Sequence, residues 1–344
     1  MAKVNELQFF ENKKVLMFAP SFFGYEKQIR KRIEDMGAKV DFFDERPSNN
    51  VWAKIFLRFF KSIMLGKIDR YYKKIDLCTE LSPYDIVFVI NIEAMPVWFI
   101  TKLRQRNLNS HFILYMWDAI FWKRNILNYV DFFHRVYSFD RNDCEAHSDK
   151  LIFRPLFYLN DYAEIAKETK QKYKYDLTFI GSAHTDRYTI LKKIETTAKK
   201  HNWTFFNYMF LQRKSIFYLY FLTNKNFRHC KAKEFSYRSL SKNEVLDIIS
   251  NSKVIVDIQG VNQLGLTMRT TEVLGAKRKL ITTNTEIAKY DFYSPDNILI
   301  IDREKPEISE DFIRTPYQET LAAETYHKYS LDGWLEDIFE IKNI

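Results

Sequence analysis

Glycine, proline and cysteine are scarce in this chain. Its 344 residues include 8 Gly, 8 Pro and 3 Cys. So few glycines and prolines exclude a collagen-like or low-complexity protein. Cys78, Cys144 and Cys230 lie far apart without the spacing of a metal site, and their odd number argues against a disulfide framework. These absences predict a globular protein of a reducing compartment.

Long apolar runs are absent as well. No segment reaches the roughly 18 uncharged apolar residues that can span a bilayer. The N-terminal sequence MAKVNELQFFENKK carries polar and acidic residues where a signal peptide has an apolar core. We therefore expect a cytoplasmic protein that is either soluble or held peripherally on the inner face of the membrane.

Aromatic residues and positive charge are abundant. The chain contains 30 Phe and 21 Tyr, and hydrophobic residues make up 46% of it, which excludes a disordered protein. A length of 344 residues is enough for two domains, each with its own core. The formal net charge of +9 favours anionic partners, among them nucleotide diphosphates, acidic glycans, anionic lipids and nucleic acids.

Short apolar runs of strand type alternate with helical segments along the chain. One series begins with residues 14–19, and a second begins with residues 176–182. Such alternation predicts an α/β fold with doubly wound, Rossmann-like sheets. Because the pattern restarts, we predict a first domain over residues 1–160, a linker over 161–175 and a second domain over 176–328.

The segment Gly265–Gly275 lies between two β-branched apolar runs, residues 253–258 and 279–284. It predicts a βαβ unit in which a glycine-bearing loop leads into a helix, and N–H groups at the start of a helix attract anions such as phosphate. Arg269 and Glu272 can share one face of that helix. An arginine suits a diphosphate, and a carboxylate suits the hydroxyls of a ribose. The alternative is that Arg269 and Glu272 form an ordinary helical ion pair.

The residues from Val256 to Asn284, which include the sequences GLTMR and EVLGA, resemble the donor half of GT-B glycosyltransferases. They are most similar to group-1-like bacterial enzymes of capsule, lipopolysaccharide and exopolysaccharide biosynthesis. The loop Pro20–Tyr25 resembles the acceptor-side half of these enzymes. Retaining members carry two glutamates eight positions apart; Glu272 matches the second, whereas Leu264 stands at the first. This departure leaves open whether the reaction inverts or retains, and whether catalysis is altered or lost.

The resemblance implies two Rossmann-like domains that face a cleft, with a C-terminal helix over residues 329–344 that returns to the first domain. It also implies that the second domain binds a nucleotide-sugar. The expected donor-binding residues are Gly181, Ser182, Arg187, Gly265, Leu266, Thr267, Arg269, Thr270 and Glu272. The loop after the first strand is expected to bind the acceptor through Phe23, Gly24 and Tyr25. A free surface arginine is the alternative for Arg187.

Acidic residues follow three predicted strands of the first domain, namely Glu93, Asp118 and Asp140. In inverting GT-B enzymes the general base is often an Asp or Glu of this half, because the acceptor hydroxyl must lose its proton as it attacks the sugar. Asp118 is the first candidate for this base and Glu93 is the second. A helix cap or a loop salt bridge is the alternative role at such positions.

These features predict a hexosyltransferase-like glycosyltransferase that moves a sugar from a nucleotide-activated donor to a cell-surface glycan or a lipid-linked acceptor. No cofactor and no metal ion is expected. The charge of the leaving diphosphate would be met by Arg269, by helix amides and by Lys277 or Arg278. The alternative is a noncatalytic nucleotide- or glycan-binding protein that keeps the fold. A basic nucleic-acid-binding protein is the third reading.

Two segments combine basic and aromatic residues, namely residues 51–74 and 205–227. The first has the spacing of an amphipathic helix with a cationic side. Such segments either pack on a domain core or lie on an anionic membrane surface. Stacking of the aromatic residues on single-stranded nucleic acid is a weaker alternative, because no RNA-binding motif accompanies them.

Overall fold

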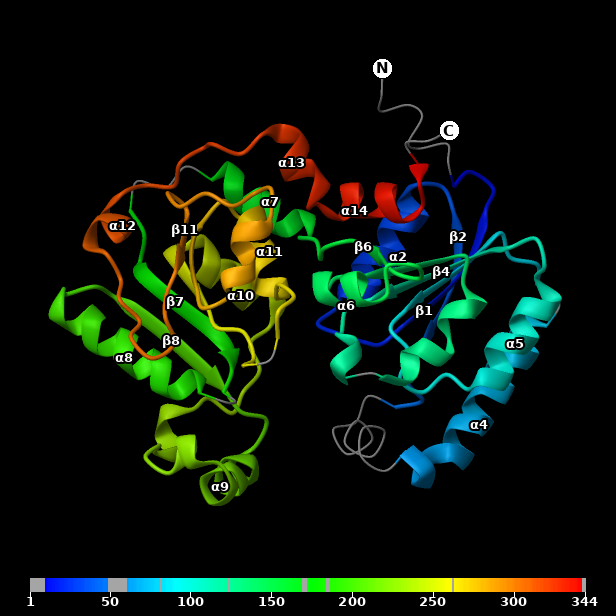
Figure 1. The fold of residues 1–344 in the computed structure, drawn as a ribbon, viewed down its shortest axis with the longest axis horizontal. Helices are drawn as coiled ribbons and strands as arrows, with labels where there is room; N and C mark the ends of the chain where they lie inside the picture. The colour runs from blue at the N-terminus through cyan, green and yellow to red at the C-terminus, as the bar shows by residue number, and fades with distance from the viewer. Residues whose placement is uncertain are drawn as a thin grey trace. The chain divides into compact units, whose positions relative to one another are not determined.

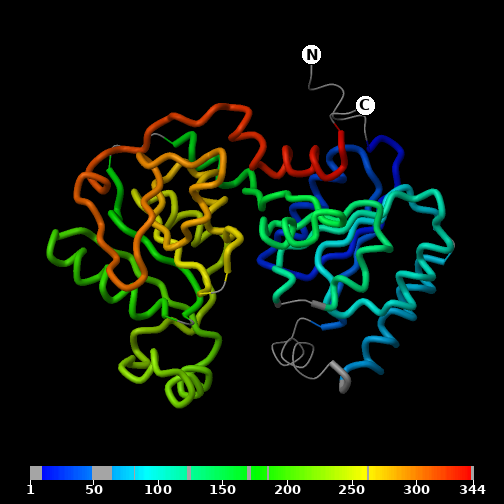
Figure 2. The backbone as a smooth tube through the Cα atoms, in the orientation of Figure 1, coloured from blue at the N-terminus to red at the C-terminus, as the bar shows by residue number. Residues whose placement is uncertain are grey.

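The structure is a computed structural model that describes residues 10–48, 61–80, 82–122, 124–168, 172–183, 186–261 and 263–341. The chain forms two compact units. Unit 1 comprises Met1–Pro155 and Trp334–Ile344, and unit 2 comprises Leu156–Gly333. The backbone trace in Figure 2 shows that the chain leaves unit 1 once and re-enters it near the C-terminus.

Unit 1 is built on a six-stranded sheet in the order β2-β1-β3-β4-β5-β6 (Figure 1). Every pair of neighbouring strands is parallel. The central strands are buried on both faces, as in a sheet that helices cover on both sides. The strands are β1 (Lys14–Ala19), β2 (Lys39–Asp44), β3 (Ile86–Ile90), β4 (His111–Met116), β5 (Arg135–Ser138) and β6 (Ile152–Phe153).

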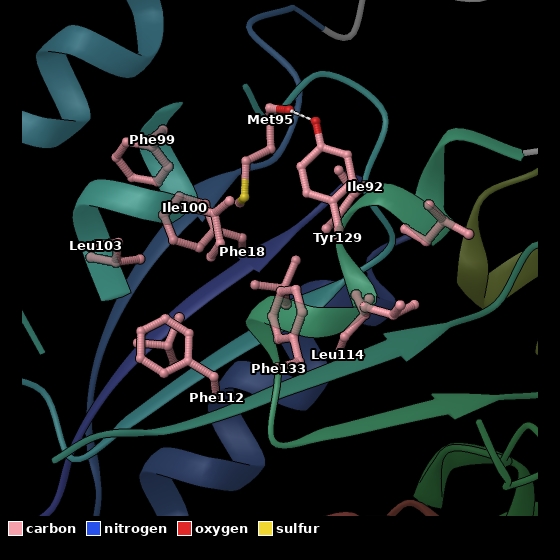
Figure 3. Packing of buried hydrophobic residues seen from close by; sticks show 14 of the residues in the cluster. Phe18, Ile92, Met95, Phe99, Ile100, Leu103, Phe112, Leu114, Tyr129 and Phe133 are labelled. Carbon is pink, nitrogen blue, oxygen red and sulfur yellow. Dashed lines mark hydrogen bonds between the residues drawn. The ribbon is translucent and has the colours of Figure 1, made fainter. Parts of the chain in front are cut away.

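One face of the unit 1 sheet is covered by two helices and by 3₁₀ turns, whose apolar side chains form one buried cluster with those of the strands. Figure 3 shows this cluster from close by, with the ring of Phe99 and the side chains of Ile100 and Leu103 above Phe18 and Phe112 of the sheet. The covering elements are α4 (Lys61–Thr79), α5 (Val97–Arg106), η1 (Ile120–Trp122), η2 (Arg124–Asn128) and η3 (Val130–Phe132).

The opposite face of the unit 1 sheet carries α2 (Tyr25–Asp35) and the C-terminal helix α14 (Leu331–Ile338). The ring of Trp334 lies 4.7 Å from that of Tyr115 and 6.0 Å from that of Phe88, measured between centroids. The short helix α6 (Arg141–Ala146) follows β5 at the edge of the unit.

Unit 2 is built on a five-stranded parallel sheet in the order β11-β10-β9-β7-β8. The strands are β7 (Tyr175–Ser182), β8 (Phe205–Phe210), β9 (Ser252–Asp257), β10 (Lys279–Thr282) and β11 (Ile298–Ile300). One face is covered by α8 (Arg187–Lys200), α9 (Lys214–Thr223), η4 (Lys225–Phe227), η5 (Ala232–Glu234) and α12 (Glu310–Arg314).

The other face of the unit 2 sheet is covered by α7 (Asn160–Lys167), α10 (Lys242–Ser250) and α11 (Met268–Gly275), and α7 contacts both of the other helices (Figure 1). The turn η6 (Thr285–Lys289) follows β10, and α13 (Ala323–Lys328) precedes α14. Helix α10 begins with a capping box, because the Ser241 hydroxyl accepts from the amide of Glu244 and the Glu244 carboxylate accepts from the amide of Ser241.

The predicted α/β class with two Rossmann-like units is confirmed. Part of the basic helix that we predict over residues 51–74 lies outside the described residues; from Lys61 onward it is helical and continues to Thr79 as α4. All three cysteines are free thiols in the structure. None of the helices in the described ranges combines the length and the apolar composition that crossing a membrane requires.

Candidate functional site

The carboxyl ends of the parallel strands in unit 2 gather polar and charged side chains at one edge of the sheet. Open α/β sheets bind their ligands at this edge, in the loops between strands and helices. The loops that follow β7, β9, β10 and β11 and the first turns of α8 and α11 all contribute. Their polar residues include Ser182, Asp186, Arg187, Asp257, Gln259, Thr267, Thr270, Thr283 and Arg303.

Helix α11 begins at this edge, as the sequence predicts, and Thr267 is its N-cap. The Thr267 hydroxyl accepts from the amide of Thr270 at 3.3 Å and donates to Oδ2 of Asp257 at 2.5 Å. The Thr270 hydroxyl donates to the same oxygen at 2.9 Å. A buried carboxylate is therefore held beside the start of the helix, where the helix dipole favours negative charge.

Arg187 ties two of these loops together. Its Nε donates to the carbonyl of Ile258 at 2.6 Å, and its Nη1 donates to the carbonyl of Ser182 at 2.9 Å. Its Nη2 makes no hydrogen bond to any residue that the structure describes. Burial lowers the pKa of the Arg187 guanidinium, although the nearby Asp257 carboxylate acts in the opposite direction. The side chain is thus fixed at the sheet edge by two of its five N–H groups.

Arg303 is a second arginine at this edge, and the sequence analysis does not single it out. Its Nε and Nη2 donate to the two carboxylate oxygens of Asp186 at 3.0 and 2.9 Å. Nη1 also donates to the Thr283 hydroxyl, and Nη2 to the carbonyl of Gln259, both at 3.0 Å. In the sequence it shortly follows the apolar run Ile298–Ile301, and no motif marks it.

Gly181 lies near the end of β7, and its lack of a side chain has a local cause. A Cβ at this position would lie 2.8 Å from the ring of Phe179 and 3.5 Å from Nη1 of Arg187. Residues two apart in a strand share a face, so this ring covers the space above Gly181. The glycine therefore allows the Phe179 ring and the Arg187 guanidinium to occupy the same corner of the site.

Arg269 and Glu272 are brought together on one face of α11, as their spacing predicts. The Arg269 Nη1 lies 2.5 Å from Oε2 of Glu272, and the Glu272 side chain is only 8% exposed. Tyr162 of α7 lies against both: burial raises the pKa of its hydroxyl, and the Glu272 carboxylate raises it further. The arrangement matches the ion-pair alternative.

Lys277 and Arg278 lie at the far end of α11 from its N-cap. Eight helical residues separate the two ends by about 12 Å. The Arg278 guanidinium donates to the carbonyls of Ala276 and Ser250, and Lys277 pairs with Glu319. The expectation that Lys277 or Arg278 meets an anion at the start of α11 is therefore wrong.

The loop between β9 and α11 is anchored to the loop after β10. The Asn284 side-chain amide donates to the carbonyl of Leu264 at 3.1 Å, and the side-chain amide of Gln263 donates to the carbonyl of Gly265 at 3.2 Å. The Leu264 side chain is 46% exposed, whereas Leu266 is 2% exposed. Leu266 thus packs inward and leaves ligand contact in this loop to its backbone and to its neighbours.

In unit 1 the ends of β3 and β4 are joined through Asn91. Its side-chain amide donates to Oδ2 of Asp118 at 2.7 Å, and its Oδ1 accepts from the amide of Trp117 at 3.0 Å. The Asn91 backbone has φ 55°, in the left-handed region that asparagine tolerates better than most residues. Asp118, the first candidate base, is therefore held in place at the carboxyl edge of the sheet and remains partly exposed.

Glu93, the second candidate, lies in a loop that Glu45 organises. Oε1 of Glu45 accepts from the amides of Glu93, Ala94 and Met95 at 2.8, 2.6 and 2.7 Å. Burial raises the pKa of Glu45 to about 7, although the three amides act to lower it. Tyr129 holds the same loop by donating to the carbonyl of Met95 at 2.6 Å (Figure 3). The sequence analysis does not identify Glu45.

The loop after β1 presents aromatic side chains at the same edge. Phe22 is 40% exposed and Phe23 74% exposed, and the ring of Phe22 lies 5.6 Å from that of Trp117. Gly24 has φ 80°, which favours glycine, and it begins α2. Tyr25 is buried. Among the three residues expected to bind an acceptor, Phe23 thus offers the largest free surface.

Asp140 has the helix-cap role that the sequence analysis allows for acidic residues after strands. Its carboxylate accepts from the amides of Asn142 and Asp143 at the start of α6. Within the part of the chain that the structure describes, no group of three or more His, Cys, Asp or Glu side chains is arranged to hold a metal ion.

Comparison with known proteins gives matches in structure alone. No protein-family model matches this chain, and no curated protein sequence matches it. An alpha-glucosyltransferase solved with UDP and a mismatched DNA superposes with a TM-score of 0.64 at 12% identity, over 97% of this chain and 100% of that one. A glycosyltransferase from Rickettsia africae superposes with a TM-score of 0.57 at 15% identity, over 96% of this chain and 97% of that one.

HepE from Anabaena, solved with UDP-glucose, gives a TM-score of 0.55 at 9% identity, over 96% of this chain and 100% of that one. Identities this low establish the arrangement of the chain and nothing finer. These superpositions cover nearly the whole of both chains, so they include both parallel sheets of this protein. The chain has the two-domain α/β fold of GT-B glycosyltransferases.

Proposed function

We propose that this protein transfers a sugar from a nucleotide-activated donor to a hydroxyl group of an acceptor. UDP is the first nucleotide to test, because solved proteins of the same fold hold UDP or UDP-glucose. Unit 2 would bind the donor at the carboxyl edge of its sheet, and unit 1 would supply the acceptor surface and the general base.

The observation that supports the proposal most strongly is the set of hydrogen bonds that orients the Arg187 guanidinium. Two of its nitrogens are bonded to carbonyls at the ends of β7 and β9, so the guanidinium is already oriented when a ligand arrives. Its Nη2 makes no bond within the described residues, so it can donate to a phosphate oxygen. A charge-assisted bond from a pre-oriented guanidinium is among the stronger contacts to an anion. We assign the main diphosphate contact to Arg187.

Arg269 and Glu272 take a supporting role in this proposal. Since they are paired with each other and lie against Tyr162, their first effect is to fix the opening turns of α11. Residues at the N-terminus of that helix would then meet the phosphates through their amides. In this scheme the departing diphosphate is stabilised by Arg187 and by helix amides, and transfer proceeds without an added metal ion or another cofactor.

The acceptor is proposed to be a glycan or a lipid-linked sugar of the cell surface. The exposed rings of Phe22 and Phe23 offer apolar faces of the kind that sugar rings pack on. Asp118 is the proposed base that removes the proton of the acceptor hydroxyl in an inverting reaction. A noncatalytic binding protein remains the second candidate, because Leu264 stands where retaining enzymes of the family that the sequence resembles carry a glutamate.

A thermal-shift screen against UDP-, GDP-, CMP- and ADP-sugars tests the donor assignment. A ligand that binds only the folded protein raises its melting temperature, by an amount that grows with ligand concentration. UDP-sugars should raise it and the other three classes should not. If no nucleotide-sugar shifts the transition even at millimolar concentration, the proposal fails. A shift without release of UDP in the presence of cell-surface glycan extracts would favour the noncatalytic candidate.

A further inference from the structure

Helix α9 of unit 2 exposes apolar side chains along one face. Tyr218 and Leu219 are 58% and 52% exposed, and Phe221 and Leu222 are 39% and 75% exposed. Leu222 lies one turn after Tyr218 and Leu219, so these side chains form a continuous strip. This strip is unusual for a short surface helix, whose outward face is normally polar.

The inner face of α9 fixes this orientation. Phe217 is 4% exposed, and its ring lies 5.5 Å from that of Phe235. The Tyr220 ring lies 5.1 Å from that of Phe227. Because these rings hold the inner face against the core of unit 2, the outer strip cannot turn inward without breaking those contacts. Core packing therefore accounts for one half of the helix, whereas the side chains of the other half are exposed.

The charged residues that precede and follow α9 in the chain are basic. No Asp or Glu occurs between Glu195 and Glu234, so the segment that contains α9 is entirely free of acidic residues. The basic residues around the helix are exposed, and they are Arg213, Lys214, Lys225, Arg228, His229, Lys231 and Lys233. An apolar strip whose neighbouring charges along the chain are all positive is complementary to a surface that is apolar beneath and anionic on top.

A pocket of about 590 Å³ lies between α8 and η4, the 3₁₀ turn that follows α9 in the chain. Its basic lining residues are Lys192, Lys193, Lys225 and His229. Lys192 is paired with Glu195 and Glu234, and Lys193 donates to the carbonyl of Glu304. Lys225 and His229 have no such partners among the described residues. The pocket can therefore accept an anionic group next to η4.

We propose that α9 docks unit 2 on an anionic phospholipid bilayer. The helix would lie in the plane of the interface, with Leu219 and Leu222 in the acyl region and Tyr218 at the level of the headgroups. Lys225 and Arg228 would contact lipid phosphates, and the pocket beside η4 would take one headgroup. The proposal does not depend on the identity of the sugar donor.

A second copy of the chain is a poorer occupant of this face. In a symmetric dimer each surface meets its own copy, so contact through α9 would bring two basic borders together. Like charges across an interface cost energy unless acidic residues intervene, and the segment has none. An anionic bilayer instead gains from each of these charges.

Flotation with lipid vesicles tests the proposal on the full-length protein. Wild type should float with vesicles of 70% phosphatidylcholine and 30% phosphatidylglycerol, and less with pure phosphatidylcholine. The double variant L219S/L222S should lower the partition coefficient at least about tenfold, since two buried leucines are lost from the bilayer. The control L108S alters a side chain of unit 1 that is 80% exposed, and it should bind like wild type.

Charge reversal tests the basic border separately. K225E/R228E should also lower the partition coefficient at least about tenfold. K39E/K305E makes the same change in net charge at exposed lysines outside the segment between Glu195 and Glu234, and it should have a much smaller effect. The proposal is overturned if wild type does not float with anionic vesicles, or if L219S/L222S floats as well as L108S. A dimer that L219S/L222S abolishes, without vesicle binding by wild type, would assign the face to self-association instead.

Discussion

The side-chain amide of Asn91 donates a hydrogen bond to Oδ2 of Asp118 across 2.7 Å. It links the ends of two neighbouring strands, and its own position is fixed because Oδ1 accepts from the amide of Trp117. A single side chain therefore sets the orientation of the carboxylate proposed as the general base. This hydrogen bond involves one oxygen of Asp118, and it holds the carboxylate in place at the carboxyl edge of the sheet.

We predict that Asp118→Asn lowers turnover by about 10²–10⁴ and leaves donor affinity nearly unchanged. Asparagine keeps the size of the side chain and can still accept from Asn91 through Oδ1, but it lacks basicity. Steady-state kinetics, with donor affinity measured by calorimetry, separate the two effects. Glu93→Gln is the matched control and should stay active. If Asp118→Asn turns over at the wild-type rate while Glu93→Gln is inactive, the base is Glu93.

Stability should depend on pH through Glu45. Burial raises its pKa from 4.5 to about 7 in the folded protein. Below pH 4.5 both states are protonated; as the pH rises towards 7 the unfolded chain loses its proton first, so folding is progressively disfavoured. The free energy of unfolding should fall by about 3 kcal/mol in total, and this decrease should be complete above pH 7. Folded protein is thus favoured on the acidic side of this window.

Glu45→Gln should remove this dependence, because glutamine keeps the oxygen that accepts from the three amides and does not ionise. Urea unfolding at pH 5 and at pH 8 measures this dependence. The free energy of unfolding of the variant, relative to that of wild type, should be about 2–3 kcal/mol higher at pH 8 than at pH 5. The exposed Glu324→Gln serves as the control. An unchanged difference between variant and wild type across this range would show that Glu45 is already ionised in the folded state.

Two glycines in helices should respond to alanine in opposite ways. At Gly275 a Cβ would lie 2.5 Å from Cγ and 2.8 Å from Cβ of Tyr158, which is 1% exposed and bonded through its hydroxyl to the carbonyl of Tyr326. Gly275→Ala should therefore lower the free energy of unfolding by about 1–3 kcal/mol or more. At Gly66, in α4, no atom of the described residues outside its own helix backbone and its chain neighbours lies within 4 Å of the added carbon.

Gly66→Ala should stabilise the protein by about 0.5–1 kcal/mol, because alanine has the higher helix propensity. Thermal or urea unfolding of both variants shows whether each substitution raises or lowers the stability of the protein. Equal effects at the two positions would mean that Tyr158 moves aside freely, and that the close approach of α11 to this ring is not a constraint.

Local sequence patterns were sufficient to predict much of the fold. Runs such as residues 253–258 are apolar and β-branched, and they alternate with helical segments, so the α/β class and the start of α11 follow from the sequence. The capping box at Ser241 is equally local, since its partners are three residues apart. The same holds for Arg269 and Glu272, whose spacing alone places them on one face.

The contacts that organise the candidate site are not local. Glu45 meets amides 48 to 50 residues later in the chain, and Arg303 meets Asp186 across 117 residues. No spacing rule relates such residues, because their meeting depends on the order of strands in the sheet. For the same reason the sequence could not place Lys277 and Arg278, which lie near α11 in the chain but at the opposite end of it from the N-cap.

Titration of UDP into the protein by calorimetry tests the central claim, that the carboxyl edge of unit 2 binds a nucleotide diphosphate through Arg187. Wild type should bind UDP saturably. Arg187→Ala should lose about 1.5–3 kcal/mol, or about 10- to 150-fold in affinity, since a charged hydrogen bond is removed. Arg314→Ala, at a side chain that is 73% exposed, should bind like wild type. Absence of UDP binding, or equal affinity in a folded Arg187→Ala and in Arg314→Ala, would contradict the claim.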